Sequence, residues 1–486
     1  MRITRHFVRV AGRLVHYRRT GSGPALLMVH QSPRSSAEYE PLMREWGAQF
    51  TIIAPDTPGF GQSEPLGHPE QPEIDEFAAA LLALLDALGL PMVGAYGFHS
   101  GAVILLAAAK LQPHRFTAIA ANGYAVWLPG ERASFGESYL PPFQPMPYGE
   151  HLVWAWNRIL EQSWFFPWYD VRDGARLSVA HADPERVHET VMDLLASGDA
   201  YRHGYGAVLR APRDVPAAGE PTPPVFLTAA DNDPLQPHLA RLGPLPMRWC
   251  VETAPTRAAT NALCFEHLLK HPAPAPPAPV EADDLGFVHV TAEGFDGLLH
   301  WRGQRDSDTL LLHAPARSAE LVARPDALAI DLPGHGLSDD WRDAEQALLD
   351  QWAKIVRGAL TALGVAPLHI EGEGWSAALA ALLGGPIPLR LDVDAGKSLL
   401  AAIPSTRPDR YGNYLTAAWA WLRAGHFFQP PHQIDAAHAV PFAPADLDPL
   451  RLQREHLAFL QSRHAGELLA ATLRQLESPP GAARAG

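Results

Sequence analysis

The chain has 486 residues, more than one hydrophobic core usually supports, so we expect at least two domains. Its composition, 47% hydrophobic and 19% charged, is typical of a folded globular protein and excludes extensive disorder. The net charge of −14 argues against a nucleic-acid partner, because phosphate binding needs a concentrated basic face.

No apolar run is long enough to cross a membrane and no secretory signal is recognisable, so we expect a cytoplasmic protein without a membrane partner. The two cysteines, Cys250 and Cys264, have no metal-ligand spacing and are expected to be core thiols. We therefore expect a small-molecule substrate and no cofactor.

Short apolar strands alternate with helices over the first 123 residues, which indicates an α/β fold with a parallel sheet. The pattern predicts a hairpin over 8–19, buried strands at 26–29 and 51–54, a helix from about 74 to 88, a strand at 92–96 and a helix that ends at about residue 112.

From 124 to 213 tryptophans and helical patterns replace the strand signals, which predicts a helical cap inserted into the sheet domain. Strands are expected again at 224–230 and 247–251, followed by a helix from about 260 to 270. The domain core then comprises 1–123 and 214–271. A Pro/Ala-rich linker over 272–282 separates it from a second lobe over 283–486.

The second lobe repeats the first, which predicts a tandem duplication. The matching residues keep their order: Asp56, Pro58, Gly59, Gly61, Ser63 and Gly97 match Asp331, Pro333, Gly334, Gly336, Ser338 and Gly372, and His30 matches His313. No counterparts of the strands at 224–230 and 247–251 follow, so the second sheet should be incomplete. An incomplete sheet needs a cover, which we expect from the first lobe or from a second subunit, as in a homo-oligomer.

Four motifs are predicted to follow strands in the first lobe. They are Val29-His30-Gln31, Asp56-Thr57-Pro58-Gly59-Phe60-Gly61, the tight turn Gly97-Phe98-His99-Ser100-Gly101, and Asp231-Asn232-Asp233-Pro234. In this order they resemble the α/β-hydrolase family over residues 1–271 and, more weakly, over 283–486. The resemblance implies an α/β-hydrolase fold with a helical cap, followed by a second, truncated lobe of the same kind.

The turn carries an unusual residue at the position of the family's nucleophile. With His99 at the tip, Gly97 and Gly101 take the two small positions, whereas a Ser100 nucleophile would place Phe98 there. The resemblance then implies two oxyanion donors, the backbone N–H groups of Ser100 and Gln31.

The family's catalytic histidine is absent from the loop 251–258. The nearest one, His267, lies in a predicted helix and is expected to be a surface residue. The acid position falls on Asp233, whose alternative role is that of a turn residue before Pro234. We therefore expect His99, oriented by Asp233, to act as a general base or, alternatively, as a nucleophile.

Further candidates are expected around the pocket. His30 should shape the oxyanion loop and Asp56 should anchor the loop after its strand, in preference to touching the substrate. Trp154, Trp164 and Trp168 of the cap are candidates to line a cavity for an apolar substrate, with Arg172 as a possible partner for a carboxylate. In the second lobe Gly374 occupies the nucleophile position, so we expect no chemistry there.

These residues predict a hydrolase that cleaves an ester, thioester, amide or carbon–carbon bond in a hydrophobic small molecule. Two alternatives remain. One is a non-hydrolytic member of the family, a lyase or a cofactor-free oxidase in which His99 removes a substrate proton. The other is a catalytically inactive binding or scaffold protein, which the missing histidine would favour.

Overall fold

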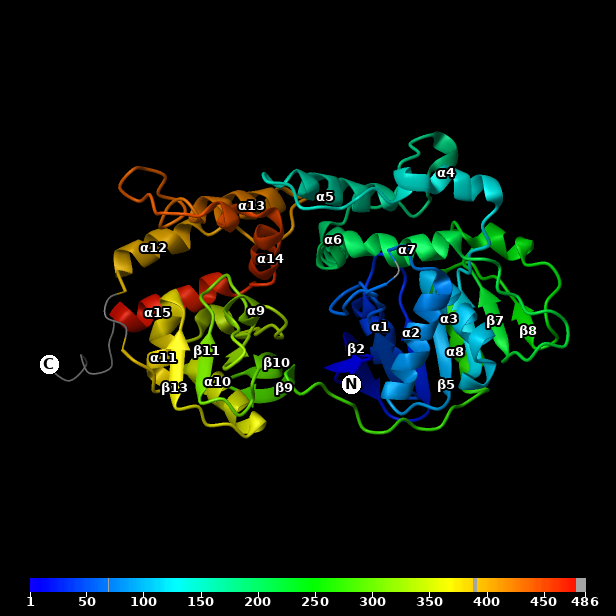
Figure 1. Cartoon of the computed structure of the whole chain (residues 1–486), viewed down its shortest axis with the longest axis horizontal. Coiled ribbons are helices and arrows are strands. Elements are labelled where there is room, and N and C mark those ends of the chain that lie inside the picture. Colours follow the sequence, from blue (N-terminus) through cyan, green and yellow to red (C-terminus); the bar gives the residue numbers. More distant parts are fainter. Residues whose placement is uncertain (69, 388–390, 478–486) are drawn as a thin grey trace. The chain divides into compact units, whose positions relative to one another are not determined.

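The computed structural model describes residues 1–68, 70–387 and 391–477. The chain divides into two compact units (Figure 1). Unit 1 comprises residues 1–144 and 155–282, and unit 2 comprises residues 145–154 and 283–486. The end of the predicted second lobe, 478–486, lies outside the described residues. Within the described part of the chain, no helix is long and apolar enough to cross a membrane.

Unit 1 is built on an eight-stranded sheet in the order β1-β2-β4-β3-β5-β6-β7-β8. Its strands are β1 (Thr4–Val10), β2 (Arg13–Gly21), β3 (Ala25–Val29), β4 (Thr51–Pro55), β5 (Val93–Phe98), β6 (Phe116–Asn122), β7 (Val225–Thr228) and β8 (Trp249–Val251). The strands from β4 to β8 run parallel, and the β1–β2 hairpin pairs antiparallel to β4. The predicted parallel sheet with an opening hairpin is confirmed.

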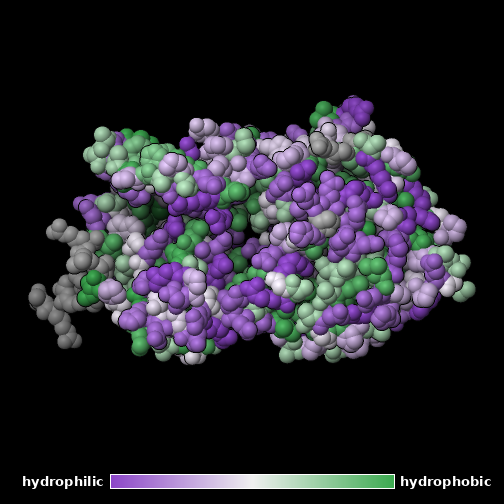
Figure 2. All heavy atoms as spheres, in the orientation of Figure 1, coloured by the Kyte–Doolittle hydropathy of each residue, from purple (hydrophilic) through white to green (hydrophobic). Residues whose placement is uncertain are grey.

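Helices α1 (Glu40–Trp46), α2 (Ile74–Ala87), α3 (Ser100–Leu111) and α8 (Arg257–Leu269) belong to the sheet domain. Between β6 and β7 the chain forms α4 (Pro129–Tyr139), α5 (Glu150–Gln162), α6 (Pro184–Ser197) and α7 (Tyr201–Arg210), where the sequence predicts the cap. One core cluster joins β3, β4 and β5 to α1 and α8. Hydrophilic residues cover much of the surface of the chain that Figure 2 shows. Cys264 lies in this core, as expected. The expectation for Cys250 is wrong, because Cys250 is exposed in the edge strand β8.

Unit 2 contains a five-stranded sheet in the order β13-β11-β12-β10-β9. Its strands are β9 (Leu285–Ala292), β10 (Phe295–Gly303), β11 (Thr309–Leu312), β12 (Leu328–Ile330) and β13 (His369–Gly372). Taken from β9, this order is the same as that of β1-β2-β4-β3-β5 in unit 1. Among its described residues the sheet stops there, so a counterpart of β6 is missing as well as those of β7 and β8.

The helices of unit 2 are α9 (Ala319–Val322), α10 (Leu349–Leu363), α11 (Ala377–Leu383), α12 (Val393–Ala402), α13 (Asn413–Gly425), α14 (Pro449–Leu460) and α15 (Ala465–Glu477). We expected the cover of the incomplete sheet to come from the first lobe or from a second subunit. That expectation is incomplete, because α15 of the same unit places Leu468 and Ala471 in the unit 2 core. Apolar residues on one face of this amphipathic helix provide part of the cover.

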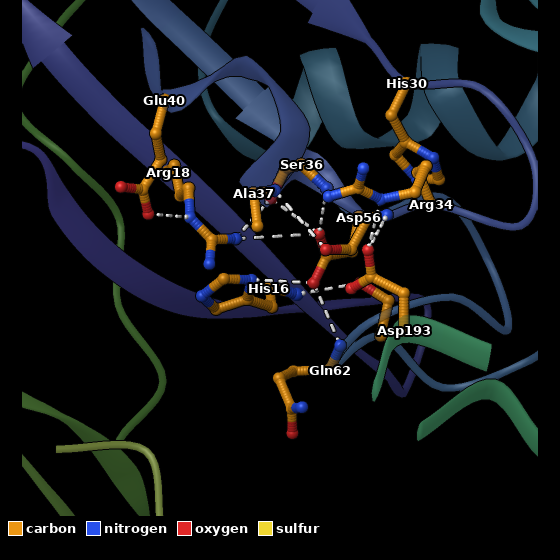
Figure 3. A network of polar contacts seen from close by, with 12 residues as sticks. His16, Arg18, His30, Arg34, Ser36, Ala37, Glu40, Asp56, Gln62 and Asp193 are labelled. Carbon is orange, nitrogen blue, oxygen red and sulfur yellow. Dashed lines mark hydrogen bonds and ion pairs between the residues drawn. The ribbon is translucent and has the colours of Figure 1, made fainter. Parts of the chain in front are cut away.

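A buried carboxylate anchors the loop that follows β4. Asp56 accepts hydrogen bonds from His16 Nδ1 at 2.8 Å, Ser36 N at 2.8 Å and Gln62 N at 2.9 Å (Figure 3). Burial raises the pKa of Asp56, but His16 and Arg18 outweigh this effect and hold it far below its usual value. Asp56 is therefore an ionised anchor, which agrees with the structural role that we expected for it.

Unit 2 repeats this arrangement. Asp331 accepts hydrogen bonds from His300 Nδ1 at 2.8 Å, Ala319 N at 2.6 Å and Leu337 N at 3.0 Å. Burial raises the pKa of Asp331, but the hydrogen bond from His300 and the nearby histidines lower it to about 2. The polar contacts that hold the loop after β4 therefore have direct equivalents after β12.

The two loops differ at one buried position. Phe60 of unit 1 lies between Gly59 and Gly61, whereas the matching residue of unit 2 is His335, which is fully buried. His335 Nδ1 lies 2.9 Å from the carbonyl oxygen of Pro333. Burial lowers the pKa of His335 to about 3, because the imidazolium loses its hydration. His335 is therefore neutral in the folded chain.

We predict that His335→Phe makes unit 2 less sensitive to acid. Between pH 6.5, the ordinary histidine pKa, and about 3, the unfolded chain binds a proton at this position that the folded chain does not bind. This difference lowers the stability of the wild type by roughly 2 kcal/mol between pH 6.5 and pH 5, and phenylalanine removes it. Hydrogen exchange of β10 and β12 at both pH values measures the effect.

The matched control is His369→Phe, because His369 is exposed. Its variant should keep the acid sensitivity of the wild type. An unchanged loss of protection on acidification in His335→Phe would show that another group controls the acid response of unit 2.

Candidate active site

His99 lies at the turn between β5 and α3, in a backbone conformation that only glycine adopts easily. Its φ is 49° and its ψ is −110°. The glycines on either side leave no room for a side chain: a Cβ on Gly97 would lie 2.6 Å from Ala102 N, and one on Gly101 would lie 1.8 Å from Val29 O. The turn therefore projects the imidazole away from the helix, while Ser100 begins α3.

The His99 ring is hydrogen-bonded to Asp233, which lies in the loop after β7. His99 Nε2 is 2.8 Å from Asp233 Oδ2, and Asp233 Oδ1 accepts the N–H of Leu235 at 2.8 Å. Burial raises the pKa of Asp233, but His99 outweighs this effect and holds it below its usual value. The carboxylate thus accepts a hydrogen bond from Nε2–H, and this tautomer of the ring has its lone pair on Nδ1.

Gly123, at the end of β6, provides the space that this ring occupies. A Cβ at Gly123 would lie 2.2 Å from His99 Cδ2. The ring also packs face to face on Phe98, at 3.9 Å between centroids and 17° between planes. The space left at Gly123 and the packing on Phe98 thus fix the plane of the imidazole.

Arg257 completes a stack that the sequence did not reveal. Its guanidinium carbon lies 3.8 Å from the centre of the Phe98 ring, on which His99 also packs. Arg257 is the first residue of α8, at the end of the loop in which the family's histidine is missing. Its sequence signal was weak: it is the one cationic residue of 251–258.

Ser100 has a structural hydroxyl group. Its Oγ is buried and accepts the N–H of Ser32 at 3.2 Å, which ties the loop after β3 to the start of α3. As the first N–H of a helix, the Ser100 amide has no acceptor within α3. This amide therefore remains suited to donate to a substrate oxygen.

The Gln31 N–H, which we expect to be the second oxyanion donor, has a carboxylate partner in the structure. Gln31 N donates to Glu38 Oε1 at 2.8 Å, and Gln31 Nε2 donates to Glu38 Oε2 at 2.8 Å. The physical reason is that the chain turns back through a short 3₁₀ segment, which brings a carboxylate onto a backbone donor that would otherwise lack a partner. No sequence motif marked Glu38.

His30 is buried and connects two loops. Its Nδ1 donates to Gln31 O at 2.9 Å, and its Nε2 accepts the N–H of Thr57 at 2.9 Å. Both ring nitrogens are thus engaged with the backbone. This geometry fits the loop-shaping role that we expected for His30.

Two tryptophans of the segment predicted as a cap donate hydrogen bonds to backbone carbonyls. Trp164 Nε1 donates to His181 O at 2.7 Å, and Trp168 Nε1 donates to Tyr139 O at 3.1 Å. Trp154 lies in the first part of α5, which belongs to unit 2.

Two further expectations are corrected. Arg172 is exposed and forms an ion pair with Asp170, so its charge is already matched at the surface. His267 is half-buried and stacks on Phe226, whereas we expected a surface residue, and burial lowers its pKa to about 4.

A cavity of about 470 Å³ lies within unit 1, close to the loop after β3. Charged side chains from several elements face this cavity. Its lining is therefore more polar than the aromatic lining that we expected. Trp154, Trp164 and Trp168 are not among its lining residues. Those that line it include Gln31, Ser32, Arg34, Glu38, Glu45, Ile159, Gln162, Arg186, Val187, Arg257 and Asn261.

Comparison with known proteins identifies the family. Residues 24–243 match the family described as "alpha/beta hydrolase fold". An uncharacterized hydrolase of Saccharomyces cerevisiae is 35% identical over 116 residues, which cover 23% of this chain and 39% of that protein. A haloalkane dehalogenase of Sphingobium indicum is 30% identical over 221 residues, which cover 44% of this chain and 69% of that enzyme. The chain therefore belongs to the α/β-hydrolase fold family.

Among solved structures, a hydrolase from Pseudomonas aeruginosa is 16% identical, with a TM-score of 0.41. The match covers 54% of this chain and 98% of that one. A bifunctional epoxide hydrolase of Mus musculus is 34% identical over 114 residues, 22% of this chain and 19% of that protein. The chain thus spans only a part of the length of the yeast and mouse proteins.

We predict that His99→Gly is more stable than His99→Ala. Both variants lose the ring and its bond to Asp233, so the comparison isolates the backbone. Alanine at a φ of 49° and ψ of −110° costs about 1–3 kcal/mol, whereas glycine adopts this conformation without strain. Because glycine also gives the unfolded chain about 0.5–1 kcal/mol of extra freedom, the expected net difference is about 1 kcal/mol. Urea denaturation measures it, and an equal or lower stability of His99→Gly would contradict the strain at this turn.

Proposed function

We propose that the chain is a hydrolase in which His99 is the general base. The observation that supports this most directly is the 2.8 Å contact between His99 Nε2 and Asp233 Oδ2 at the strained turn. An acid that fixes the tautomer and plane of an imidazole is the arrangement that general-base catalysis requires. With Nε2 bound to Asp233, the reactive nitrogen is Nδ1.

In the proposed reaction Nδ1 takes a proton from a water molecule as the water oxygen attacks the electrophilic carbon of the substrate. Asp233 stabilises the resulting imidazolium, and the Ser100 N–H donates to the developing negative charge on the substrate oxygen. The imidazolium then returns the proton to the leaving group. We expect the cleaved bond to be that of an ester, thioester or amide, or an activated carbon–carbon bond.

Glu38 supports a second candidate function. While its carboxylate holds the Gln31 N–H, only the Ser100 amide is left to stabilise an oxyanion. This state of the site suits a reaction that depends on a base more than on a pair of oxyanion donors. Removal of an acidic C–H proton by His99, in a lyase or a cofactor-free oxidation, is such a reaction. Hydrolysis with two oxyanion donors requires that the substrate displace Glu38 from Gln31.

We propose that unit 2 is a degenerate copy of the unit 1 core and has no chemistry of its own. Gly374 has a φ of 53° and matches His99, so the turn persists without a functional side chain. Its neighbour Gly372 is as crowded as Gly97, since a Cβ there would lie 2.3 Å from Ser376 O. The copied turn therefore supports a structural role for unit 2.

We predict that His99→Ala abolishes turnover while Ser100→Ala changes it by less than about tenfold. Asp233→Asn should lower kcat by about a thousandfold or more, because the amide cannot stabilise the imidazolium and selects the wrong tautomer. The measurement is a screen of all three variants and the wild type on aryl and acyl esters, thioesters and β-diketones. Equal rates for wild type and His99→Ala would remove His99 from the mechanism and favour a binding or scaffold protein.

We predict that Glu38→Ala distinguishes the two candidate functions. If the reaction is hydrolysis, the variant frees the Gln31 N–H, and kcat for esters should rise by roughly tenfold or more, since one oxyanion donor contributes up to about a hundredfold or more. If kcat falls instead, and the β-diketone exchanges its acidic proton with solvent, the result supports proton abstraction assisted by Glu38. Glu40→Ala is the control, because Glu40 pairs with Arg18 and Arg44 outside the cavity.

A further inference from the structure

The cavity beside the loop after β3 contains an arginine that lacks an anionic partner. Arg257 packs on Phe98, and its charge helps to lower the pKa of Asp233, but within the described part of the chain no carboxylate lies within ion-pair distance of its guanidinium. Arg34, which lines the same cavity, differs in this respect because its Nε lies 2.7 Å from Asp193 Oδ2. A guanidinium that is held in place and left unpaired at a cavity wall is suited to bind an anion.

We propose that this cavity binds a small molecule that carries a carboxylate, with Arg257 as its partner. The proposal rests on the proposed function, because it assigns the cavity to the substrate of the His99 site. His99 and Phe98 are not among the residues that line the cavity, but Arg257 and His99 both pack on the Phe98 ring. A carboxylate on Arg257 would thus hold the rest of the substrate near the turn that bears His99.

Asn261 supplies a second donor next to Arg257. The two residues lie one turn apart on α8, which places them on the same face of the helix, and both line the cavity. Asn261 Oδ1 accepts from Tyr96 Oη at 2.8 Å and from Asn122 Nδ2 at 3.2 Å, so the orientation of the amide is fixed. Its Nδ2 has no acceptor among the described residues and remains as a donor for a ligand oxygen.

The other charges of the cavity favour a carboxylate over a phosphate. Glu38 and Glu45 also line the cavity, and each would repel a dianion more strongly than a single negative charge. The planar guanidinium fork also matches the two oxygens of a carboxylate. Arg186, which is exposed and likewise has no ion-pair partner among the described residues, adds a second positive charge at the cavity wall.

Calorimetric titration of the full chain with benzoate, phenylacetate and 3-phenylpropionate tests the proposal, with the corresponding amides and phenyl phosphate as comparison probes. At least one carboxylate should bind at least tenfold more tightly than its amide and than phenyl phosphate. Arg257→Gln should weaken carboxylate binding roughly 10- to 100-fold, as expected for the loss of a charge-assisted pair. Arg172→Gln is the matched control, because Arg172 is exposed and paired with Asp170, and it should bind as the wild type does.

His99→Ala separates this proposal from the proposed function, because it should abolish turnover and retain carboxylate binding. Circular dichroism and the melting temperature of each variant establish that it is folded. The proposal is overturned if no carboxylate binds, if an amide or phenyl phosphate binds as tightly as the carboxylate, or if folded Arg257→Gln and Arg172→Gln bind alike.

Discussion

The close approach of α3 to the sheet is the constraint on which the candidate site depends. The start of this helix lies so near β3 that a single added carbon at Gly101 would overlap the carbonyl of Val29. The chain enters the helix there with a positive φ at His99. The cost of the turn explains the position of the ring, because the same geometry that strains the backbone directs the side chain away from the helix. Asp233 can reach it since β5 and β7 are parallel and end at the same edge of the sheet.

The matching turn in unit 2 keeps the positive φ but lacks a reactive side chain. Its positive φ falls on Gly374, where the conformation is not strained and no side chain is available to react. The buried carboxylates Asp56 and Asp331, by contrast, keep equivalent hydrogen bonds in both units. Replacing such a carboxylate would leave two backbone N–H groups unsatisfied, which is costly in a buried loop. The proposed duplication thus accounts for a copy that keeps its anchors and has lost its reactive residue.

Much of the fold could be predicted from the sequence because its signals are local. Apolar runs fix the strands, and the spacing of Gly97 and Gly101 fixes which residue occupies the turn. The proximity of His99 to Asp233 also follows, since strand ends determine it. Side-chain partners that depend on loop geometry could not be predicted in this way: Glu38 reaches Gln31 through a short 3₁₀ segment, and Arg257 reaches Phe98 only because α8 begins beside β5. The sequence likewise contains no signal that the indoles of Trp164 and Trp168 are bound to backbone carbonyls.

The absence of the family's usual histidine from 251–258 therefore has a physical consequence for the proposed mechanism. In this chain the acid position is retained, and the imidazole that Asp233 holds comes from the turn itself. One residue then occupies the nucleophile position and supplies the base, so the proposed base has no separate side-chain nucleophile to activate. Water or an acidic proton of the substrate becomes the natural target of Nδ1, and no covalent intermediate is required. Arg257, which packs on Phe98, adds a positive charge where the family's histidine was expected, and its planar set of donors suits the binding of an anionic group.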